Sequence, residues 1–498
     1  MTPNTKHILS IDQGSSGTKA IIFDSQANLV CKFSTPLSTL YLKEGFVEQD
    51  PELIFSNVLE AVEGCLENFR SKGNDPASIS CIGISNQRET FVLWDENGKP
   101  LYNAISWQCK RSIQICEKLN QNEVFAETVQ RNTGLIIDPY FSGTKLKWLR
   151  ENVQDIKKAI EAKKVYFGTI DTWLLFRLTK GESYLTDYTN ASRTLLFNLH
   201  DLSWDKSILE SLGLSDIILP QAVPSSHYFG SSDCNGLFKK EIPITGMIGD
   251  SHAAAFGEGC FSAGTAKATM GTGCSIMMNI GPAFKPSKNG MVTTICWSTE
   301  NRVDFAMEGI IVSCGATIEW LKNELNLFEN SVTTNDMARN VEDNAGVYLI
   351  PAFSGLGAPH WQMNRKASIS GLTFGVNKNH IVRAALESIP YQIKDIVQAI
   401  KEDTGIDLEN IMVDGAISSN TFVMEFLASL LKKSLKTLAM FDVSALGAAM
   451  IAGLKSGLYK DLDELKKLNK IKQEIKPSLP NELMDRYYGE WKIALSKI

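Results

Sequence analysis

Two short polar turns that contain glycine lie in the two halves of the chain, and each joins two apolar strand patterns. The first turn is residues 12–19 (DQGSSGTK), between expected strands at residues 8–11 and 20–23. The second is residues 270–274 (MGTGC), between expected strands at residues 266–270 and 275–279. Strands joined by such turns are typical of β-hairpins. The repeat predicts two similar α/β halves whose turns face one shared cleft.

The length of the chain, 498 residues, also favours two large domains, because a single hydrophobic core rarely serves so many residues. Alternating strand and helix patterns continue to about residue 243, where the pattern restarts. We therefore expect a first domain over residues 1–253 and a second over residues 254–453. Residues 454–498 are expected to form a charged helical tail that packs on the second domain.

Composition excludes several classes of protein. The formal net charge of -6 offers no basic surface for a nucleic acid. None of the ten cysteines belongs to a CxxC pair, and most lie in apolar runs, which indicates buried free thiols in a reducing compartment. Residues 1–7 do not resemble a signal peptide, and no apolar run reaches the 18 or more residues of a membrane span. We predict a cytoplasmic protein that neither enters a membrane nor binds nucleic acid.

The first turn carries groups that suit a phosphate. Its glycines let backbone N–H groups converge, and its serines and Lys19 can bind phosphate oxygens. Asp12, at the end of the first strand, can hold Mg²⁺ directly or through water. An ordinary turn is the alternative interpretation of this segment taken alone. Because the chain has no GxxxxGK[ST] motif, and no GxGxxG motif that opens a helix, a P-loop or dinucleotide-binding fold is disfavoured.

Two glycine segments in the second half permit the same interpretation. Residues 270–274 form the second turn, and residues 413–420 (VDGAISSN) follow a short strand and precede an expected helix. A helix N-terminus offers positive potential to a nucleotide. The alternative for the latter segment is a simple helix start, capped by Ser418 or Ser419.

Two groups of polar residues can carry chemistry. Arg88 and Glu89 follow the expected strand at residues 79–85, and such a pair can donate to one hydroxyl of a diol and accept from the next. An exposed surface ion pair is the alternative. Asp250 ends the expected strand at residues 244–248 and can accept a hydroxyl proton, although it can also be a helix N-cap. Its neighbours Ser251 and His252 do not make a hydrolase triad, because adjacent residues cannot form that relay.

At these motifs the chain resembles the FGGY carbohydrate kinases, and within them the members that phosphorylate glycerol. The segments that carry the resemblance occur in the expected order along about nine tenths of the chain. They are SIDQG (10–14), GFVEQDP (45–51), SNQRET (85–90), IDPYFS (137–142), TDYTNASRT (186–194), PAFSGLGAP (351–359) and ALGAA (445–449). The resemblance implies two actin-like, ribonuclease-H-like α/β domains with a nucleotide and substrate cleft between them.

The resemblance also implies roles for individual residues. Asp250 takes the position of the general base, and Asp12 that of the metal-associated aspartate, with ATP and Mg²⁺ as cofactors. The implied substrate-binding residues are Arg88, Glu89, Trp107, Tyr140, Asp250 and Ser251. The implied nucleotide-binding residues are Ser15, Ser16, Gly17, Lys19, Thr272, Gly315, Glu319, Ala416 and Asn420. The implied partner is a small polyol, and the expected assembly is a homodimer or homotetramer.

Four positions depart from the pattern of the family. Ser251 and Ser275 stand where the family has a long amide and an aromatic ring, so the substrate pocket is expected to be larger or more polar. Glu319 replaces glutamine near the purine, and Ala416 replaces a glycine. Glycerol is therefore the first candidate substrate, a C4 or C5 polyol or ketose is the second, and a non-catalytic nucleotide-binding protein is the third.

Overall fold

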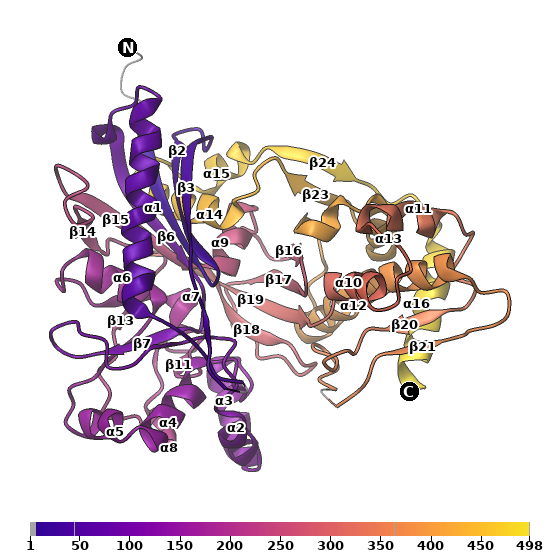
Figure 1. The fold of residues 1–498 in the computed structure, drawn as a ribbon, viewed down its shortest axis with the longest axis horizontal. Coiled ribbons are helices and arrows are strands. Elements are labelled where there is room, and N and C mark those ends of the chain that lie inside the picture. The colour runs from indigo at the N-terminus through magenta and orange to yellow at the C-terminus, as the bar shows by residue number, and fades with distance from the viewer. Residues whose placement is uncertain (1–5, 44, 363, 498) are drawn as a thin grey trace.

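The computed structural model describes residues 6–43, 45–362 and 364–497. Within them the chain forms two α/β halves, each built on a mixed sheet, that lie side by side (Figure 1). The two-domain α/β fold expected from the sequence is confirmed.

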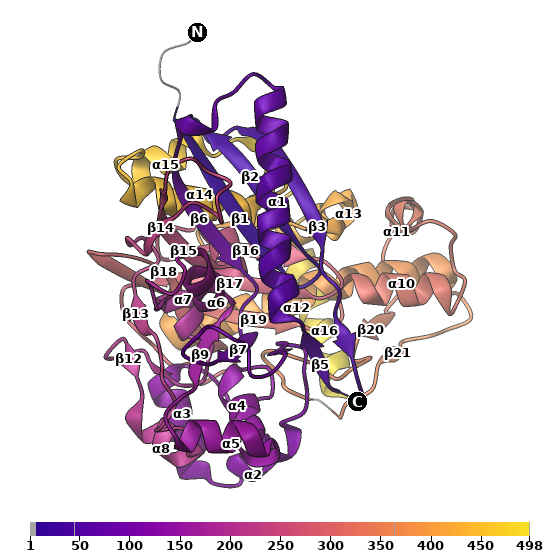
Figure 2. The ribbon, with the colours of Figure 1, turned by 60° about the vertical axis from the view of Figure 1, so that its left-hand side comes forward.

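The first sheet combines an antiparallel hairpin region with parallel strands. Strands β1, β2 and β3 run antiparallel in chain order, whereas β6 and β15 lie parallel to β1 on its other side. In spatial order the sheet is β14 (Gly230–Ser232), β15 (Ile242–Gly249), β6 (Ile79–Asn86), β1 (His7–Gly14), β2 (Gly17–Asp24) and β3 (Leu29–Pro36). Helix α1 (Pro51–Ser71) packs on one face of β1–β3, as Figure 2 shows.

The second sheet repeats this arrangement. The antiparallel strands β16, β17 and β19 are followed by β22 and β23, which lie parallel to β16. In spatial order the sheet is β18 (Val292–Thr299), β19 (Arg302–Ile311), β17 (Cys274–Gly281), β16 (Thr265–Met270), β22 (Asn410–Asp414), β23 (Leu435–Leu438) and β24 (Ile471–Ile475). Helices α12 (Lys378–Thr404) and α13 (Thr421–Leu431) pack against each other beside it. The duplication predicted from the two turns is therefore present.

Two small-residue helices cross where the halves meet. Helix α9 (Asp250–Gly257) follows β15 directly, and α14 (Val443–Lys455) packs on α9 and on the first sheet. The two backbones approach closely because Gly447 has no side chain, since a Cβ there would lie 1.8 Å from the Ala253 carbonyl oxygen. Residues 443–453, which the sequence predicts to belong to the second domain, pack on the face of the first sheet opposite α1.

The tail differs from the expected helical segment. It contains α15 (Leu462–Leu468), then strand β24, then α16 (Asn481–Ser496). Strand β24 pairs antiparallel with β23 and forms the edge of the second sheet, a pairing that the sequence of the tail alone does not reveal. Leu465 of α15 joins the core between the halves, and α16 packs on α13.

The remaining elements surround these sheets. A third sheet contains β4 (Leu40–Tyr41), β5 (Val47–Gln49), β8 (Ala104–Ile105), β7 (Phe91–Trp94) and β9 (Tyr166–Thr169). The short strand pairs are β10 (Leu185–Asp187) with β13 (Gln221–Val223), β11 (Phe197–Asn198) with β12 (Ser203–Trp204), and β20 (Tyr348–Ile350) with β21 (Ser368–Ser370). The other helices are α2 (Ile113–Asn120), α3 (Glu123–Thr133), α4 (Ser142–Asn152), α5 (Gln154–Glu161), α6 (Ile170–Leu178), α7 (Tyr188–Ala191), α8 (Lys206–Leu212), α10 (Gly315–Asn323) and α11 (Thr334–Arg339).

All ten cysteines are free and buried, as the sequence predicted. Among the described residues, no helix is both long enough and apolar enough to cross a membrane.

Candidate active site

Three neighbouring strands of the first sheet deliver polar residues to one edge. Asp12 lies near the end of β1, Arg88 and Glu89 follow β6, and Asp250 follows β15. These strands are parallel, and Asn86 at the end of β6 is in register with both Gln13 and Gly249. Because the carboxyl ends of parallel strands meet at the same edge, residues far apart in the sequence share one site.

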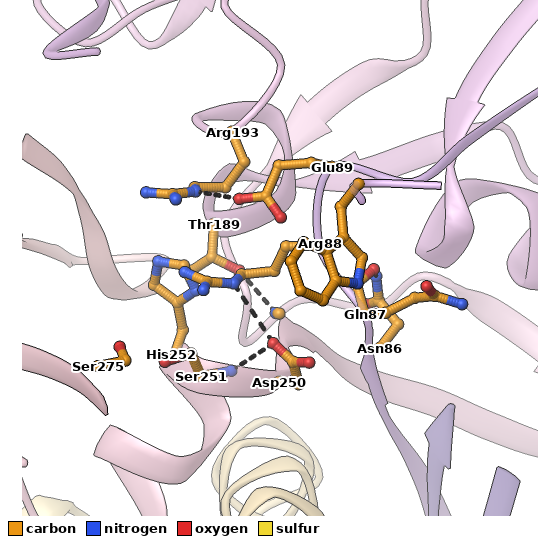
Figure 3. A network of polar contacts seen from close by, with 12 residues as sticks. Asn86, Gln87, Arg88, Glu89, Thr189, Arg193, Asp250, Ser251, His252 and Ser275 are labelled. Carbon is orange, nitrogen blue, oxygen red and sulfur yellow. Dashed lines mark hydrogen bonds and ion pairs between the residues drawn. The ribbon is translucent and has the colours of Figure 1, made fainter. Parts of the chain in front are cut away.

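Arg88 lies at the centre of a buried ion-pair network. Its Nη2 and Nη1 atoms donate to Oε1 and Oε2 of Glu308, at 3.1 and 3.3 Å. Its Nε atom lies 3.3 Å from Oδ1 of Asp250, as Figure 3 shows. Only 7% of the Arg88 side chain is exposed, so the alternative of a surface ion pair is wrong.

Glu89 pairs with a residue that the sequence did not single out. Arg193 Nε donates to Glu89 Oε1 at 2.6 Å, and Arg193 Nη1 lies 2.9 Å from Glu308 Oε2. Arg88 and Glu89 therefore do not pair with each other but belong to one chain of alternating charges, in the order Glu89, Arg193, Glu308, Arg88 and Asp250. Glu89 also has a φ of 58° and is buried, and such left-handed backbone is uncommon for a residue other than glycine and is concentrated at functional sites.

The network fixes the charge of Glu308. Burial alone would raise the pKa of this carboxyl, but the guanidiniums of Arg88 and Arg193 hold the pKa well below its usual range. Burial raises the pKa of Glu89 in spite of its pairing with Arg193. Glu308 is therefore a permanent anion between two buried cations.

Asp250 is more accessible than its neighbours. Its side chain is 39% exposed, whereas the Arg88 side chain beside it is nearly buried. Oδ1 of Asp250 accepts from the Ser251 N–H at 2.6 Å and faces Arg88 Nε. Gly249, not Asp250, is the N-cap of α9, so the helix-cap alternative is wrong. Asp250 is free to accept a proton from a hydroxyl group at the surface of the site.

The neighbours of Asp250 add further polar groups. The hydroxyl of Ser251 is buried without a hydrogen-bond partner among the described residues, and Ser275 Oγ donates to Glu308 Oε1 at 3.1 Å. His252 is completely buried, with Nε2 3.3 Å from Thr294 Oγ1. Burial and the nearby Arg88 hold the pKa of His252 well below its usual value, so the ring is neutral.

An aromatic wall borders the network. Trp107 Nε1 donates to Ser15 Oγ at 2.7 Å, and its ring meets the ring of Tyr140 edge-on at 5.5 Å between centroids. The Arg193 guanidinium lies 5.9 Å from the centre of the Tyr140 ring. Lys145, which is fully buried, donates to the Tyr140 carbonyl at 2.8 Å, and burial lowers its pKa to about 8.

Asp12 is suited to a cation. Burial raises its pKa to about 6, and the nearby carboxylates of Asp250 and Asp442 add to this effect. Ser85 Oγ donates to Asp12 Oδ1 at 2.9 Å. The nearby Lys19 lowers the pKa of Asp12 in part, and among the described residues no three His, Cys, Asp or Glu side chains gather into a metal site. Asp12 would therefore offer Mg²⁺ a single carboxylate, which suits an ion that takes most of its ligands from water and substrate phosphates.

The first turn is a two-residue hairpin turn at Ser15 and Ser16, between the paired residues Gly14 and Gly17. The predicted phosphate lysine, Lys19, is paired with Asp442 at 2.9 Å, and this carboxylate raises the pKa of Lys19 although burial opposes the rise. Lys32 lies 3.0 Å from the same carboxylate. A phosphate at this turn would compete with Asp442 for Lys19.

The glycine segments of the second half come together. Gly315 N–H donates to the Gly271 carbonyl at 2.9 Å, and Ala316 N–H donates to the Thr272 carbonyl at 3.0 Å. Gly415 has a φ of 89°, and a Cβ there would lie 2.4 Å from the Met270 carbonyl oxygen. The loop that contains Gly415 therefore packs directly on the second turn.

The predicted nucleotide-binding residues beside these glycine segments differ in exposure and in hydrogen bonding. Thr272 and Ala416 are exposed, and Ser331 Oγ donates to Glu319 Oε1 at 2.9 Å. Asn420 Oδ1 accepts from the Val423 N–H and caps α13, so the alternative interpretation, a cap by Ser418 or Ser419, is wrong. Both serines instead lie in a short 3-10 turn, residues 416–419, which places them before the helix.

A cavity lies beside these residues in the second half. This cavity of about 910 Å³ is lined by residues that include Asp414, Gly415, Ala416 and Phe441. Oδ1 of Asp414 is buried without a hydrogen-bond partner among the described residues. The residues present therefore fit a magnesium nucleotide, with Asp12 on the first sheet as a carboxylate for the cation and exposed glycine-rich backbone on the second sheet for the nucleotide.

Sequence reasoning missed Arg193, Lys145 and Glu308 as site residues. Arg193 lies within the TDYTNASRT segment, which carries part of the family resemblance, but the resemblance was not used to assign a role to this arginine. Glu308 is one of two buried acids, with Asp304, in the largely apolar strand β19, a pattern that signals a buried partner but not its identity. Their partners come from other elements, so only the fold could pair them.

Two α/β domains thus meet around a buried network of charged side chains to which both contribute. Residues 7–257 match the N-terminal domain, and residues 266–456 the C-terminal domain, of the FGGY family of carbohydrate kinases. The chain belongs to this family.

Individual relatives extend the match to nearly the whole chain. Glycerol kinase of Caldanaerobacter subterraneus subsp. tengcongensis is 44% identical over 99% of this chain and 98% of its own length. The structure of Plasmodium falciparum glycerol kinase with ADP is 34% identical, with a TM-score of 0.94, over 99% of this chain and 98% of that one. The structure of a xylulose kinase from Lactobacillus acidophilus has a TM-score of 0.88 at 22% identity and covers 99% of both chains, which shows a shared fold alone.

Proposed function

We propose that this chain is an ATP-dependent polyol kinase that converts glycerol to glycerol 3-phosphate with release of ADP. The observation that carries the proposal is the accessible Asp250 carboxylate, which Arg88 holds at 3.3 Å beside the Asp12 carboxyl at the same sheet edge. The glycerol kinases that match nearly the whole chain support the choice of glycerol.

Asp250 acts as the general base. Its carboxylate accepts the proton of the hydroxyl that is phosphorylated, which makes the oxygen a better nucleophile. Arg88 donates to one polyol hydroxyl, and the Glu89 carboxylate accepts from another. Trp107 and Tyr140 lie against the carbon chain, and Ser251 offers a further hydroxyl contact.

The nucleotide residues would hold the phosphate chain of ATP near that hydroxyl. Bound ATP would supply the phosphoryl group, and Mg²⁺ would neutralise part of the phosphate charge. Asp12 would hold the Mg²⁺, directly or through water. The first turn, with Ser15, Ser16, Gly17 and Lys19, would bind phosphate oxygens, as would Thr272. The remaining nucleotide contacts in this proposal are made by Gly315, Glu319, Ala416 and Asn420.

The proposal includes the organisation and the cellular setting of the enzyme. Residues 1–253 form a polyol and phosphate domain, residues 254–453 a nucleotide domain, and residues 454–498 a tail on the second domain. The enzyme acts in the cytoplasm as a homodimer or homotetramer. Ten buried free thiols support a reducing compartment.

A C4 or C5 polyol or ketose is the second candidate substrate. It is favoured by the unpartnered hydroxyl of Ser251, because a buried polar group gains from a partner that a longer polyol could offer. A non-catalytic nucleotide-binding protein is disfavoured, because Asp12, Arg88, Glu89 and Asp250 all remain assembled at one edge.

The test is ADP release measured with glycerol, dihydroxyacetone, erythritol and xylulose, each with and without Mg²⁺. We expect release that requires both Mg²⁺ and a polyol, fastest with glycerol. Asp250→Asn should lower kcat about 100-fold to 10,000-fold, the usual contribution of a general base. Asp205→Asn, which alters a carboxylate that caps α8 away from the site, is the matched control and should keep normal turnover. Normal turnover by Asp250→Asn would refute the role of Asp250.

A further inference from the structure

Glu308 belongs to the second sheet, yet its carboxylate lies among residues of the first half. It is on β19, between Met277 of β17 and Val292 of β18, and its side chain is not exposed. Its partners Arg88 and Arg193 come from the first half, from the end of β6 and from the residues after α7. The site that binds the polyol in the proposed function therefore contains a contribution from the opposite half.

The carboxylate of Glu308 contacts three side chains at once, those of Arg88, Arg193 and Ser275. Arg88 donates to both oxygens, Arg193 Nη1 lies 2.9 Å from Oε2, and Ser275 Oγ donates to Oε1. A forked contact between guanidinium and carboxylate fixes the plane of the arginine as well as its position. Once both Nη atoms of Arg88 are held, the direction of its Nε–H toward Asp250 is set too.

We propose that Glu308 is a positioning residue for polyol recognition: it orients Arg88, is itself oriented by Ser275, and makes the second half part of the polyol site. The proposal rests on the proposed kinase activity. Glu308 acts on the polyol through Arg88 and, by way of Arg193, through Glu89, so its loss acts on the binding of polyol more than on the binding of nucleotide.

The same geometry predicts what the loss of Glu308 does. Without its charge, Arg88 and Arg193 become two buried cations with no anion between them, and they separate. Arg88 then keeps only its contact with Asp250 and no longer presents a fixed donor to the substrate. Among the described residues, the hydrogen bonds and ion pairs of Arg88, Arg193 and Glu308 do not include Gly315 or Gly415.

The experiment compares Glu308→Gln, Glu308→Asp and Ser275→Ala with a matched control, Asp304→Asn. Asp304 is also a buried carboxylate on β19, roughly 13 Å along the strand from Glu308 at the usual rise per residue. It accepts from Arg302 Nε at 2.7 Å and from Asn279 Nδ2 at 2.9 Å, outside the polyol site. The kcat, the KM for glycerol, the KM for ATP and the Tm are measured for each variant.

We expect Glu308→Gln to raise the KM for glycerol at least about 10-fold, the scale for breaking a buried charge pair, and the KM for ATP less than about 2-fold. Ser275→Ala should raise the KM for glycerol about 2-fold to 5-fold, the value of one hydrogen bond, and Glu308→Asp should recover part of the loss. Asp304→Asn should lower the Tm and leave both KM values unchanged.

Equal changes in the two KM values for Glu308→Gln, or the same glycerol effect in Asp304→Asn, would show a merely structural role and overturn the proposal. If Glu308→Gln does not fold, Glu308→Asp and Ser275→Ala decide, and normal glycerol KM values in both overturn it. The wild-type enzyme separates the two proposals. No turnover of any polyol by the wild type refutes the kinase function and this role with it, whereas wild-type turnover with an unaffected Glu308→Gln refutes only the role of Glu308.

Discussion

The crossing of α9 and α14 gives the sharpest test of how packing supports the site. Asp250 is the first residue of α9, so any displacement of that helix moves the proposed base. Gly447 lies in the middle of α14 at the point of closest approach, where a Cβ would lie 1.8 Å from the Ala253 carbonyl oxygen and 3.0 Å from the Gly257 nitrogen. We predict that Gly447→Ala separates the two helices.

Two opposing effects set the change in the free energy of unfolding that Gly447→Ala causes. Alanine favours a helix interior over glycine by about 1 kcal/mol. Against this, 1.8 Å is far inside the 3.4 Å at which ordinary contact begins, and the atoms that would be struck are backbone atoms that cannot rotate away. Overpacking of this kind costs about 1–3 kcal/mol or more. Because the contact here is extreme, we expect a net loss of at least about 2 kcal/mol.

Gly489, in α16, is the matched control, because a Cβ there meets no atom within 4 Å. By thermal denaturation, Gly447→Ala should lower the Tm by about 2 °C or more, whereas Gly489→Ala should raise it by about 1 °C. The kcat for glycerol should fall in the first variant and stay unchanged in the second. A Gly447→Ala protein at least as stable as Gly489→Ala would refute the argument that this close approach requires glycine.

Three further predictions concern charge and exposure. Asp12→Asn should abolish Mg²⁺-dependent turnover yet raise the Tm at pH 8. The folded state raises the pKa of Asp12 to about 6, so above that pH the ionised carboxylate lowers the stability of the wild type. The gain in Tm over the wild type should therefore vanish as the pH falls toward 4, where the wild-type carboxyl is protonated. A lower Tm at pH 8 would contradict this. Asp442→Asn should lower the KM for ATP about 2-fold to 5-fold, since it frees Lys19 from a partly exposed ion pair, and an unchanged KM in a coupled assay would show that Lys19 does not bind phosphate. Finally, a thiol reagent should modify the ten buried cysteines only after denaturation, and rapid reaction in the native enzyme would contradict their burial.

The sequence by itself determined the repeated architecture and most of one edge of the site. Hairpin patterns around residues 12–19 and 270–274 are local, since strand propensity and glycine turns act over a few residues. The sequence also predicts strand ends at Asp12, Arg88, Glu89 and Asp250, because these polar residues follow apolar strand patterns directly. Parallel pairing of these strands then requires that their ends meet.

Tertiary structure alone decided the partners of those residues. Arg88 pairs with Glu308, 220 positions away, rather than with its neighbour Glu89, and Lys19 pairs with Asp442 rather than standing free. Likewise α14 covers the first sheet, and β24 joins the second. No local pattern encodes such contacts, because a buried charge is compensated by whichever opposite charge the fold brings within reach, and that choice depends on how the two halves pack.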